Sequence, residues 1–434
     1  CACATALACG GNGPDPTELG SGAIRSLQNL LGTNAVALDV AFDPAHDGLL
    51  LAALQRGPAD YGRGEVGRPA NEPPIAVLGR YNERLQAMWS VSGAAAFAAN
   101  TRPALAADAD GNMLLALGDF DGELDLGAGP HTGSIVAQLS LADGFTRWSV
   151  SVNQRPRFVL ADPDGSTVVA GEVAGPPDSG FTQARIERLA PSNGALLSSR
   201  PLGVGTGNVF IESVGIDADG NLLAGGAFDG TLTLAAVYTQ IPGQQAGFVA
   251  KIGRDSGAAL WSRPLRKRAN ADRIVVAPLA NGDVAMAGIF AFADDAADAD
   301  DPLGPTIYLR LARLSGATGE TIWTTRVNLP NTAMLDVVDL ADGTEDLLFN
   351  ATFSGTFQLG ALNAVSTADT SMALARFAGN DGTPQWLRFT STTAARGHRV
   401  GVDAGGDAIG VGTFAAQDAD GRALASIFVI RVVQ

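Results

Sequence analysis

The chain has 434 residues, of which 46% are hydrophobic and 17% charged, with 54 glycines and 22 prolines. This balance is typical of a globular β-rich protein and excludes a disordered one. The formal net charge of −16 disfavours nucleic acid as a partner, because the field of the whole protein repels a phosphate backbone.

The first residues are predicted to be a tether. All three cysteines, Cys1, Cys3 and Cys9, lie there, so we expect no disulfide and no thiolate metal site elsewhere. The sequence begins at Cys1 as a mature bacterial lipoprotein does, which predicts a lipid on Cys1 and attachment to the outer membrane or cell surface; an extracellular location is the alternative. Glycine and proline predict a flexible tether over residues 1–21 and one domain over 22–434.

A turn signal recurs seven times along this domain. Variants of D-x-D-G, each set between apolar runs, stand at 43–48, 108–111, 162–165, 217–220, 280–282, 339–343 and 403–406. Each predicts a β-hairpin. The final glycines are 54 to 63 residues apart, and a regular period of this size indicates a repeat architecture.

Each repeat has a second half made of an apolar strand, a glycine turn and a tryptophan strand. It is clearest at 248–262 and recurs at 135–149, 308–324 and 372–388, with a looser copy at 75–90. Glycine precedes tryptophan by four residues, as in Gly257 and Trp261. This spacing predicts a positive φ at the glycine and packing of the tryptophan against the neighbouring repeat. The third copy has Ser198 in place of tryptophan.

Four strands in each of seven repeats predict an all-β fold, a seven-bladed β-propeller of four-stranded antiparallel blades. A linear β-solenoid is the alternative. The last repeat ends one strand short, while residues 22–32 resemble a fourth strand. We therefore predict that this N-terminal strand closes the ring, with Ile24 and Leu27 beside residues 427–433.

The repeat resembles the bacterial β-propeller repeat of many surface and secreted proteins, in its apolar strand, D-x-x-G, G-x-F, F-V-A-K and G-x-x-x-W elements over about residues 22–434. The segment ATGETIW at 317–323 is also similar to the tryptophan docking motif of quinoprotein alcohol dehydrogenases. A third resemblance is to the propeller lipoprotein of the outer-membrane β-barrel assembly machinery, which typically has eight shorter blades. These resemblances imply a propeller, and the third implies a lipidated cysteine.

Motifs of catalysis are absent from the sequence, so we expect no catalytic residue, no metal and no cofactor. The three histidines, His46, His131 and His398, stand in different repeats without metal-ligand spacing. The Asp-x-Asp-Gly turns suit calcium or hairpins, and we expect hairpins, of type I′ or a related type. GVGTG at 203–207 is predicted to be a loop rather than a phosphate cradle.

Two charged segments are the candidate interaction loops. A basic run over 263–273 includes Arg263, Arg266, Lys267 and Arg268, and an acidic run over 294–302 includes Asp294, Asp295, Asp298, Asp300 and Asp301. Solvated surface is the simplest interpretation of both, and the acidic run also suits calcium. Their opposite charges would also suit contact with a protein partner or a second copy of the chain.

We therefore predict a non-catalytic binding or assembly scaffold, with function in the loops of one face. The alternatives are a structural subunit of an extracellular assembly and a quinoprotein-like oxidoreductase that depends on a cofactor. The sequence does not identify a small-molecule ligand.

Overall fold

The computed structural model of the protein describes residues 24–433 apart from 31–34, 44–47, 56–58, 61–64, 67–74, 85, 94, 98–101, 176–179, 240–244, 266–272, 291–307, 329–333, 343–345, 367, 391–393, 403–405 and 418–422. Regular secondary structure in these ranges consists of β-strands. None of the described segments is a helix long and apolar enough to cross a membrane.

Most strands belong to antiparallel sheets of four, here numbered first to seventh along the chain. The first sheet holds β2 (Ala35–Asp43), β3 (Gly48–Gln55), β6 (Ile75–Tyr81) and β7 (Ala87–Gly93). The second holds β9 (Ala104–Ala107), β10 (Asn112–Asp125), β11 (Pro130–Ser140) and β12 (Thr146–Ser151), with the short β8 (Ala96–Phe97) also paired to β10. The third holds β13 (Arg155–Ala161), β14 (Thr167–Ala174), β15 (Thr182–Leu189) and β16 (Leu196–Pro201).

The remaining sheets follow the same order. The fourth holds β18 (Val209–Ile216), β19 (Leu222–Phe228), β22 (Ala246–Ile252) and β23 (Ala259–Leu265). The fifth holds β24 (Ile274–Pro278), β25 (Val284–Phe290), β26 (Tyr308–Leu314) and β27 (Thr321–Asn328). The sixth holds β28 (Met334–Asp342), β29 (Leu347–Ser354), β32 (Ser371–Phe377) and β33 (Pro384–Phe389), and the seventh holds β34 (Ala395–Val402), β35 (Ala408–Gln417), β36 (Ala423–Val432) and β1 (Ile24–Leu30).

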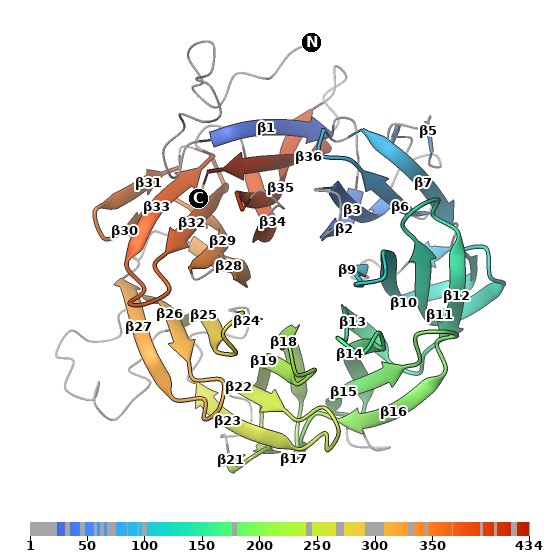
Figure 1. Ribbon diagram of the computed structural model, residues 1–434, viewed down its shortest axis with the longest axis horizontal. Helices are drawn as coiled ribbons and strands as arrows, with labels where there is room; N and C mark the ends of the chain where they lie inside the picture. Colours follow the sequence, from blue (N-terminus) through green and yellow to red (C-terminus); the bar gives the residue numbers. More distant parts are fainter. Residues whose placement is uncertain are drawn as a thin grey trace.

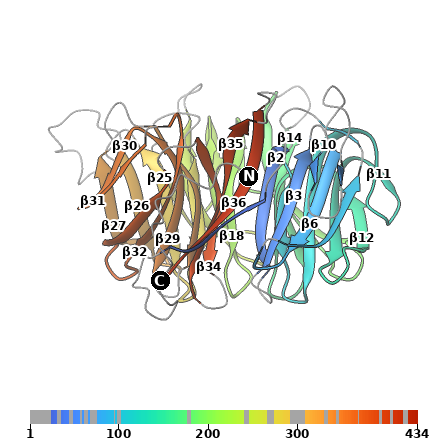
Figure 2. The same cartoon turned by 90° about the horizontal axis from the view of Figure 1, so that it is seen from above.

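The sheets stand around a common centre, with the first strand of each sheet innermost (Figure 1). These inner strands contact one another in the order β2, β9, β13, β18, β24, β28, β34, and β34 contacts β2 in turn. Viewed at right angles, the sheets stand side by side in a thick disc (Figure 2). This arrangement of radial four-stranded sheets is a propeller-type fold.

The hydrophobic core is divided among the junctions between neighbouring sheets. β3 shows how one strand serves two junctions, because successive side chains of a strand point to opposite faces. Leu49 and Leu51 pack against the seventh sheet, whereas Leu50 and Leu54 pack against the second. All eight residues of β3 are therefore buried, as expected for a strand covered on both faces.

The predicted pairing of the N-terminal strand is confirmed. β1 lies antiparallel to β36, with Ile24 opposite Val432 and Leu27 opposite Ile430. The first and last strands of the described chain therefore share one sheet, and the outer edge of β36 is covered by β1.

The two edges of the sheets form two different faces of the disc. The turns from first to second and from third to fourth strand lie at one edge of each sheet, here called the turn face. The connections from second to third strand, and from one sheet to the next, lie at the opposite edge, here called the insert face. This follows from the antiparallel strand order.

The insert face carries strands that interrupt the repeat. They are β4 (Ala59–Asp60) with β5 (Glu65–Val66), β17 (Val204–Thr206) with β20 (Thr231–Thr233) and β21 (Val237–Thr239), and β30 (Thr356–Leu359) with β31 (Leu362–Val365). The prediction of a loop at 203–207 is wrong, because Val204–Thr206 pairs with β20. The glycine that permits it is Gly205, where a Cβ would lie 1.8 Å from the carbonyl oxygen of Thr231.

Candidate functional site

The aspartates of the repeated turns accept hydrogen bonds from the backbone of the same turns and so stabilise them. Asp217 Oδ1 accepts hydrogen bonds from the backbone N–H groups of Asp219 and Asn221 at 3.0 and 2.8 Å. Gly220 donates its N–H to the Asp217 carbonyl at 2.9 Å and has a φ of 78°. Asp108 is bonded in the same way by Asp110 and Asn112. Hairpins are therefore the structural role of these turns, as predicted.

Of the turn types that the prediction allowed, type I′ or a related one, the structure has a related one. A type I′ turn needs positive φ at both central residues. In the turn at 108–112, positive φ occurs at Gly111 alone, at 74°. One left-handed glycine after a right-handed segment is the pattern of a three-residue hairpin loop with a type I turn. Ala109 and Asp110, between the aspartate and the glycine, therefore have ordinary backbone conformations.

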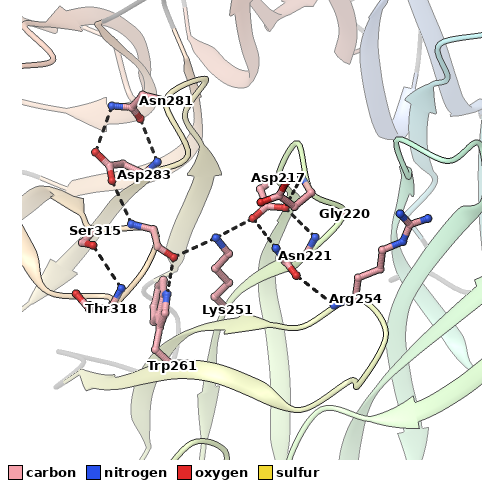
Figure 3. A network of polar contacts seen from close by, with 12 residues as sticks. Asp217, Gly220, Asn221, Lys251, Arg254, Trp261, Asn281, Asp283, Ser315 and Thr318 are labelled. Carbon is pink, nitrogen blue, oxygen red and sulfur yellow. Dashed lines mark hydrogen bonds and ion pairs between the residues drawn. The ribbon is translucent and has the colours of Figure 1, made fainter.

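In the third, fourth and fifth sheets a basic side chain of the third strand joins the turn to the next sheet. In the second sheet Gln138 stands in this place and donates to Asp108 at 2.8 Å. Lys251 Nζ lies 2.8 Å from Asp217 Oδ2 and donates to the Gly316 carbonyl oxygen, in the fifth sheet, at 3.0 Å (Figure 3). The two side chains are only 10% and 6% exposed. Burial raises the pKa of the Asp217 carboxyl, but hydrogen bonds from Lys251 and Asn221 lower it by more, so the pKa stays below its ordinary value.

The tryptophan of the fourth strand shares that acceptor. Trp261 Nε1 donates to the Gly316 carbonyl at 3.0 Å, beside the bond from Lys251 (Figure 3). The same pair of bonds occurs at Leu141, which accepts from Arg80 and Trp89, each at 2.8 Å. It occurs again at Gly379, which accepts from Arg313 at 2.7 Å and Trp323 at 2.8 Å. One carbonyl thus anchors both side chains at each of these junctions.

The turn glycines make room for these tryptophans. A Cβ on Gly319 would lie 2.5 Å from the ring of Trp261, and one on Gly382 equally close to Trp323. Both glycines also have positive φ, at 71° and 73°. The prediction that the tryptophan packs against the neighbouring repeat is confirmed, and the glycine that it meets belongs to that neighbour.

Sequence reasoning missed how the third sheet compensates for Ser198. Arg200, two residues later on β16, takes the position over the turn of the fourth sheet, where a Cβ on Gly257 would lie 2.5 Å from its Cδ. Arg200 also donates to the Ser256 carbonyl, and Arg188 of β15 donates to the Gly220 carbonyl at 2.9 Å. The sequence signal is an arginine two residues after the serine that replaces tryptophan.

The candidate interaction loops fall mostly outside the described residues. Arg266, Lys267 and Arg268, the acidic run with Asp294, Asp295, Asp298, Asp300 and Asp301, and Cys1 all lie there. Arg263 is described; it is exposed on β23 and its Nε donates to the Gly319 carbonyl at 3.2 Å. The strands that flank the two segments end at the insert face. Among the described residues, no three His, Cys, Asp or Glu side chains are grouped to hold a metal ion.

A hollow of about 740 Å³ lies between the fifth and sixth sheets at the turn face. Asn281, Arg313, Trp323, Asp346 and Asn380 are among its lining residues. Arg313 is bonded to Asp283, and Asp346 to Arg376, so these charges are already paired. Residues 343–345, in the same turn as Asp346, lie outside the described part of the chain, so we assign no ligand to this hollow.

Charged residues also gather where the inner strands begin, at the insert face. Asp39 of β2 accepts from Arg399 of β34 at 3.1 Å and from the Leu105 N–H at 2.8 Å, which ties three sheets together. Asp119 of β10, a non-glycine residue with a φ of 53°, pairs with Arg155 of β13.

His398 of β34 lies among these cations. Burial, together with the positive charges of Arg399, Arg102 and Arg396, lowers the pKa of His398 to about 4. The imidazole is therefore neutral at physiological pH.

No protein-family model matches the chain, and no curated protein matches its sequence. Among solved structures it is similar to BamB from Moraxella catarrhalis, at 15% identity and a TM-score of 0.43, over 94% of this chain and 99% of that one. It is also similar to quinohemoprotein alcohol dehydrogenase from Comamonas testosteroni, at 9% identity and a TM-score of 0.41, over 94% and 76%. The propeller-type fold follows from the strand order and the junction cores described above.

Proposed function

We propose that this chain is a seven-bladed β-propeller, closed by β1, that binds or assembles a protein partner at the cell envelope and catalyses no reaction. The blade count is supported by the circuit of inner-strand contacts, which passes from β2 through every sheet and back. It is also supported by the buried cluster that joins the first and seventh sheets, where Val40 and Leu51 meet Val411 and Val429.

One observation carries the scaffold function: the groups that recur from repeat to repeat are used in holding the turns and joining the sheets. The Asp217 carboxylate, the Lys251 ammonium and the Trp261 indole N–H all have partners within the turn or across the junction. A frame built this way leaves recognition to the parts that differ between repeats, and these lie at the insert face. The quinoprotein-like motif is accounted for in the same way, because Trp323 donates to Gly379.

The two charged segments are the proposed contact surface. The basic segment joins β23 of the fourth sheet to β24 of the fifth, and the acidic segment joins β25 to β26 of the fifth. The strands that flank both segments end at the insert face. Opposite charges at such positions favour fast, orientated association with a partner of complementary charge. A second copy of the chain also offers that complementarity. Lipid attachment at Cys1 is part of the proposal.

Co-purification from the native envelope tests this proposal. One variant replaces Asp294, Asp295, Asp298, Asp300 and Asp301 by Asn, and a second replaces Arg266, Lys267 and Arg268 by Gln. The control variant replaces Asp110 and Asp219, two exposed acids of the turn face, by Asn. We expect both insert-face variants to lose partner that the wild type and the control retain. Equal recovery by all four proteins would rule out these segments as the contact surface.

Two measurements separate the alternatives. Size measurements over a concentration range detect self-association, and loss of association in either insert-face variant identifies a structural subunit that assembles with itself. A visible absorption spectrum of the native protein tests the cofactor-dependent oxidoreductase, because a bound quinone absorbs where the polypeptide does not. Such a band would overturn the non-catalytic proposal.

A further inference from the structure

The start of β34 carries an arrangement of donors that the scaffold does not use. The strand is innermost in the seventh sheet (Figure 1), and its first residues are at the insert face. The ladder between β34 and β35 shifts register between Gly397 and Arg399, so His398 is the extra residue of a β-bulge. Bulges re-aim side chains, and here the bulge lies between two arginines.

The neighbouring blade holds the bulge in place. Gly397 donates its N–H to Thr352 Oγ1 at 3.0 Å, and Asn350 Nδ2 donates to the Arg399 carbonyl at 2.8 Å. Asn350 is fully buried, and a Cβ on Gly397 would lie 2.0 Å from its Oδ1. The backbone around His398 is therefore fixed before any ligand arrives, which lowers the entropic cost of binding.

The side chains of the bulge present donors to one another and to solvent. His398 Nε2 lies 3.1 Å from Thr413 Oγ1, and Thr413 stands opposite Arg396 in the ladder. If the neutral ring donates its Nε2–H to Thr413, the hydroxyl is left to donate its own hydrogen outward. Arg396 is exposed beside it, with the planar guanidinium that matches carboxylate and phosphate oxygens.

The charges around this point are positive. Those that act on His398 come from Arg399, Arg102 and Arg396. Asp39, the acid beside them, is bonded to Arg399 by contacts of 3.1 and 3.2 Å and also accepts from Leu105. The exposed guanidinium of Arg396 therefore adds positive charge at this point in a chain of net charge −16, and such a charge attracts anions.

We propose that Arg396, His398 and Thr413 bind the oxyanion of a small carboxylate or phosphate ligand at the insert-face end of β34. Arg396 supplies the charge-assisted hydrogen bonds, Thr413 donates through its hydroxyl, and His398 orients that hydroxyl. This site is independent of the proposed scaffold function, because it uses neither of the charged segments.

Histidine NMR tests the site directly, since the chain has three histidines. Inorganic phosphate and acetate are titrated separately into protein labelled with ¹⁵N at histidine, at low ionic strength. We expect a saturable shift of the His398 ring signals with at least one anion, and a rise of the His398 pKa from about 4, because a bound anion favours the imidazolium. His131, which is bonded to Ser149 and Ser151, is the internal reference and should not shift.

Matched variants connect the shift to the site. Arg396→Gln should weaken anion binding by about 10- to 100-fold, the usual worth of a hydrogen bond to a charged group. Thr413→Val should weaken it less. Arg147→Gln removes an equal charge from an exposed position on β12 and should change nothing. A separate titration with vesicles of anionic phospholipid shows whether the phosphate belongs to a free ligand or to a lipid headgroup.

The proposal is wrong if neither anion nor vesicle shifts His398. It is also wrong if Arg147→Gln and Arg396→Gln reduce the response equally, because general charge attraction would then explain it.

Discussion

The two faces of the disc are built on different rules. At the turn face the same side chains return from sheet to sheet, and the acid, base and indole of the fourth sheet are bonded within about 3 Å of their partners (Figure 3). At the insert face the strands that join the regular sheets differ in number and length from one sheet to the next. The repeat therefore specifies the frame at one face and leaves the other free to vary.

Within the turn face, the junction that lacks tryptophan shows what the frame requires. Trp261 covers Gly319 and donates to a carbonyl of the fifth sheet, whereas Arg200 covers Gly257 and donates to a carbonyl of the fourth. A flat group with an N–H donor is the shared property, because both the indole and the guanidinium have it. Ser198 is tolerated because Arg200 supplies this group from the same strand.

The largest effect is expected from removing the strand that joins the chain ends. Deletion of residues 22–32 exposes the edge of β36 and should cost on the order of 5 kcal/mol, at about 1 kcal/mol for each backbone hydrogen bond lost. Deletion of residues 1–20 should leave the free energy of unfolding unchanged. Denaturant unfolding of the two deletions measures the difference, and equal stability would mean that β1 contributes nothing.

The second-largest loss of stability is expected from breaking the buried ion pair of the turn face. Lys251→Met leaves the Asp217 carboxylate, 6% exposed, without its cation and should destabilise the protein by about 3–5 kcal/mol. The double variant Lys251→Met with Asp217→Asn should recover most of this loss, because no buried charge remains. A double variant as unstable as the single one would show that Lys251 acts through packing alone.

Replacing a turn glycine separates crowding from backbone strain. Gly319→Ala should cost about 1 kcal/mol for its positive φ and a further ~1–3 kcal/mol for contact with Trp261. Gly111→Ala has the same strain, at a φ of 74°, but no atom within 4 Å of the new Cβ, so it should cost only the first part. If thermal unfolding shows the same loss of stability in both variants, Trp261 moves to accommodate the added methyl group.

Acid should weaken the turn face through Asp217. Its pKa is below the ordinary value of 3.8, so its contribution to stability is present above that value and is lost as pH falls through the lower pKa of the folded state. We expect the wild type to lose more stability below about pH 4 than the double variant described above. Parallel pH profiles of the two proteins would contradict this.

The smallest effect on stability is expected at the insert face. Changing the five aspartates of 294–302 to Asn should alter the free energy of unfolding by less than about 0.5 kcal/mol, the usual range for surface substitutions. Calcium chelation should likewise leave thermal stability unchanged if the acidic run and the Asp-Gly turns bind no calcium. A marked fall on chelation would mean that calcium is part of the frame.

Intact mass spectrometry of the native protein tests the lipid on Cys1. We expect a mass above that of the polypeptide by the mass of a lipid. A Cys1→Ser form should then be soluble without detergent, and an unmodified Cys1 in protein taken from native membranes would contradict the prediction.

The sequence by itself determined the repeat, the hairpins and the pairing of β1 with β36. The repeat and the hairpins depend on local signals, namely apolar alternation along a strand and glycine in a turn. The pairing of β1 with β36 depends on the number of strands counted in each repeat. The partner of Trp261 is different, because Gly316 is 55 residues away and the two meet only when two sheets pack. The same holds for the contact of Arg200 with Gly257. It also holds for the bond between Arg399 and Asp39, which are 360 positions apart. Alternation along a strand tells which side chains are buried, but only the packed ring decides what each one meets.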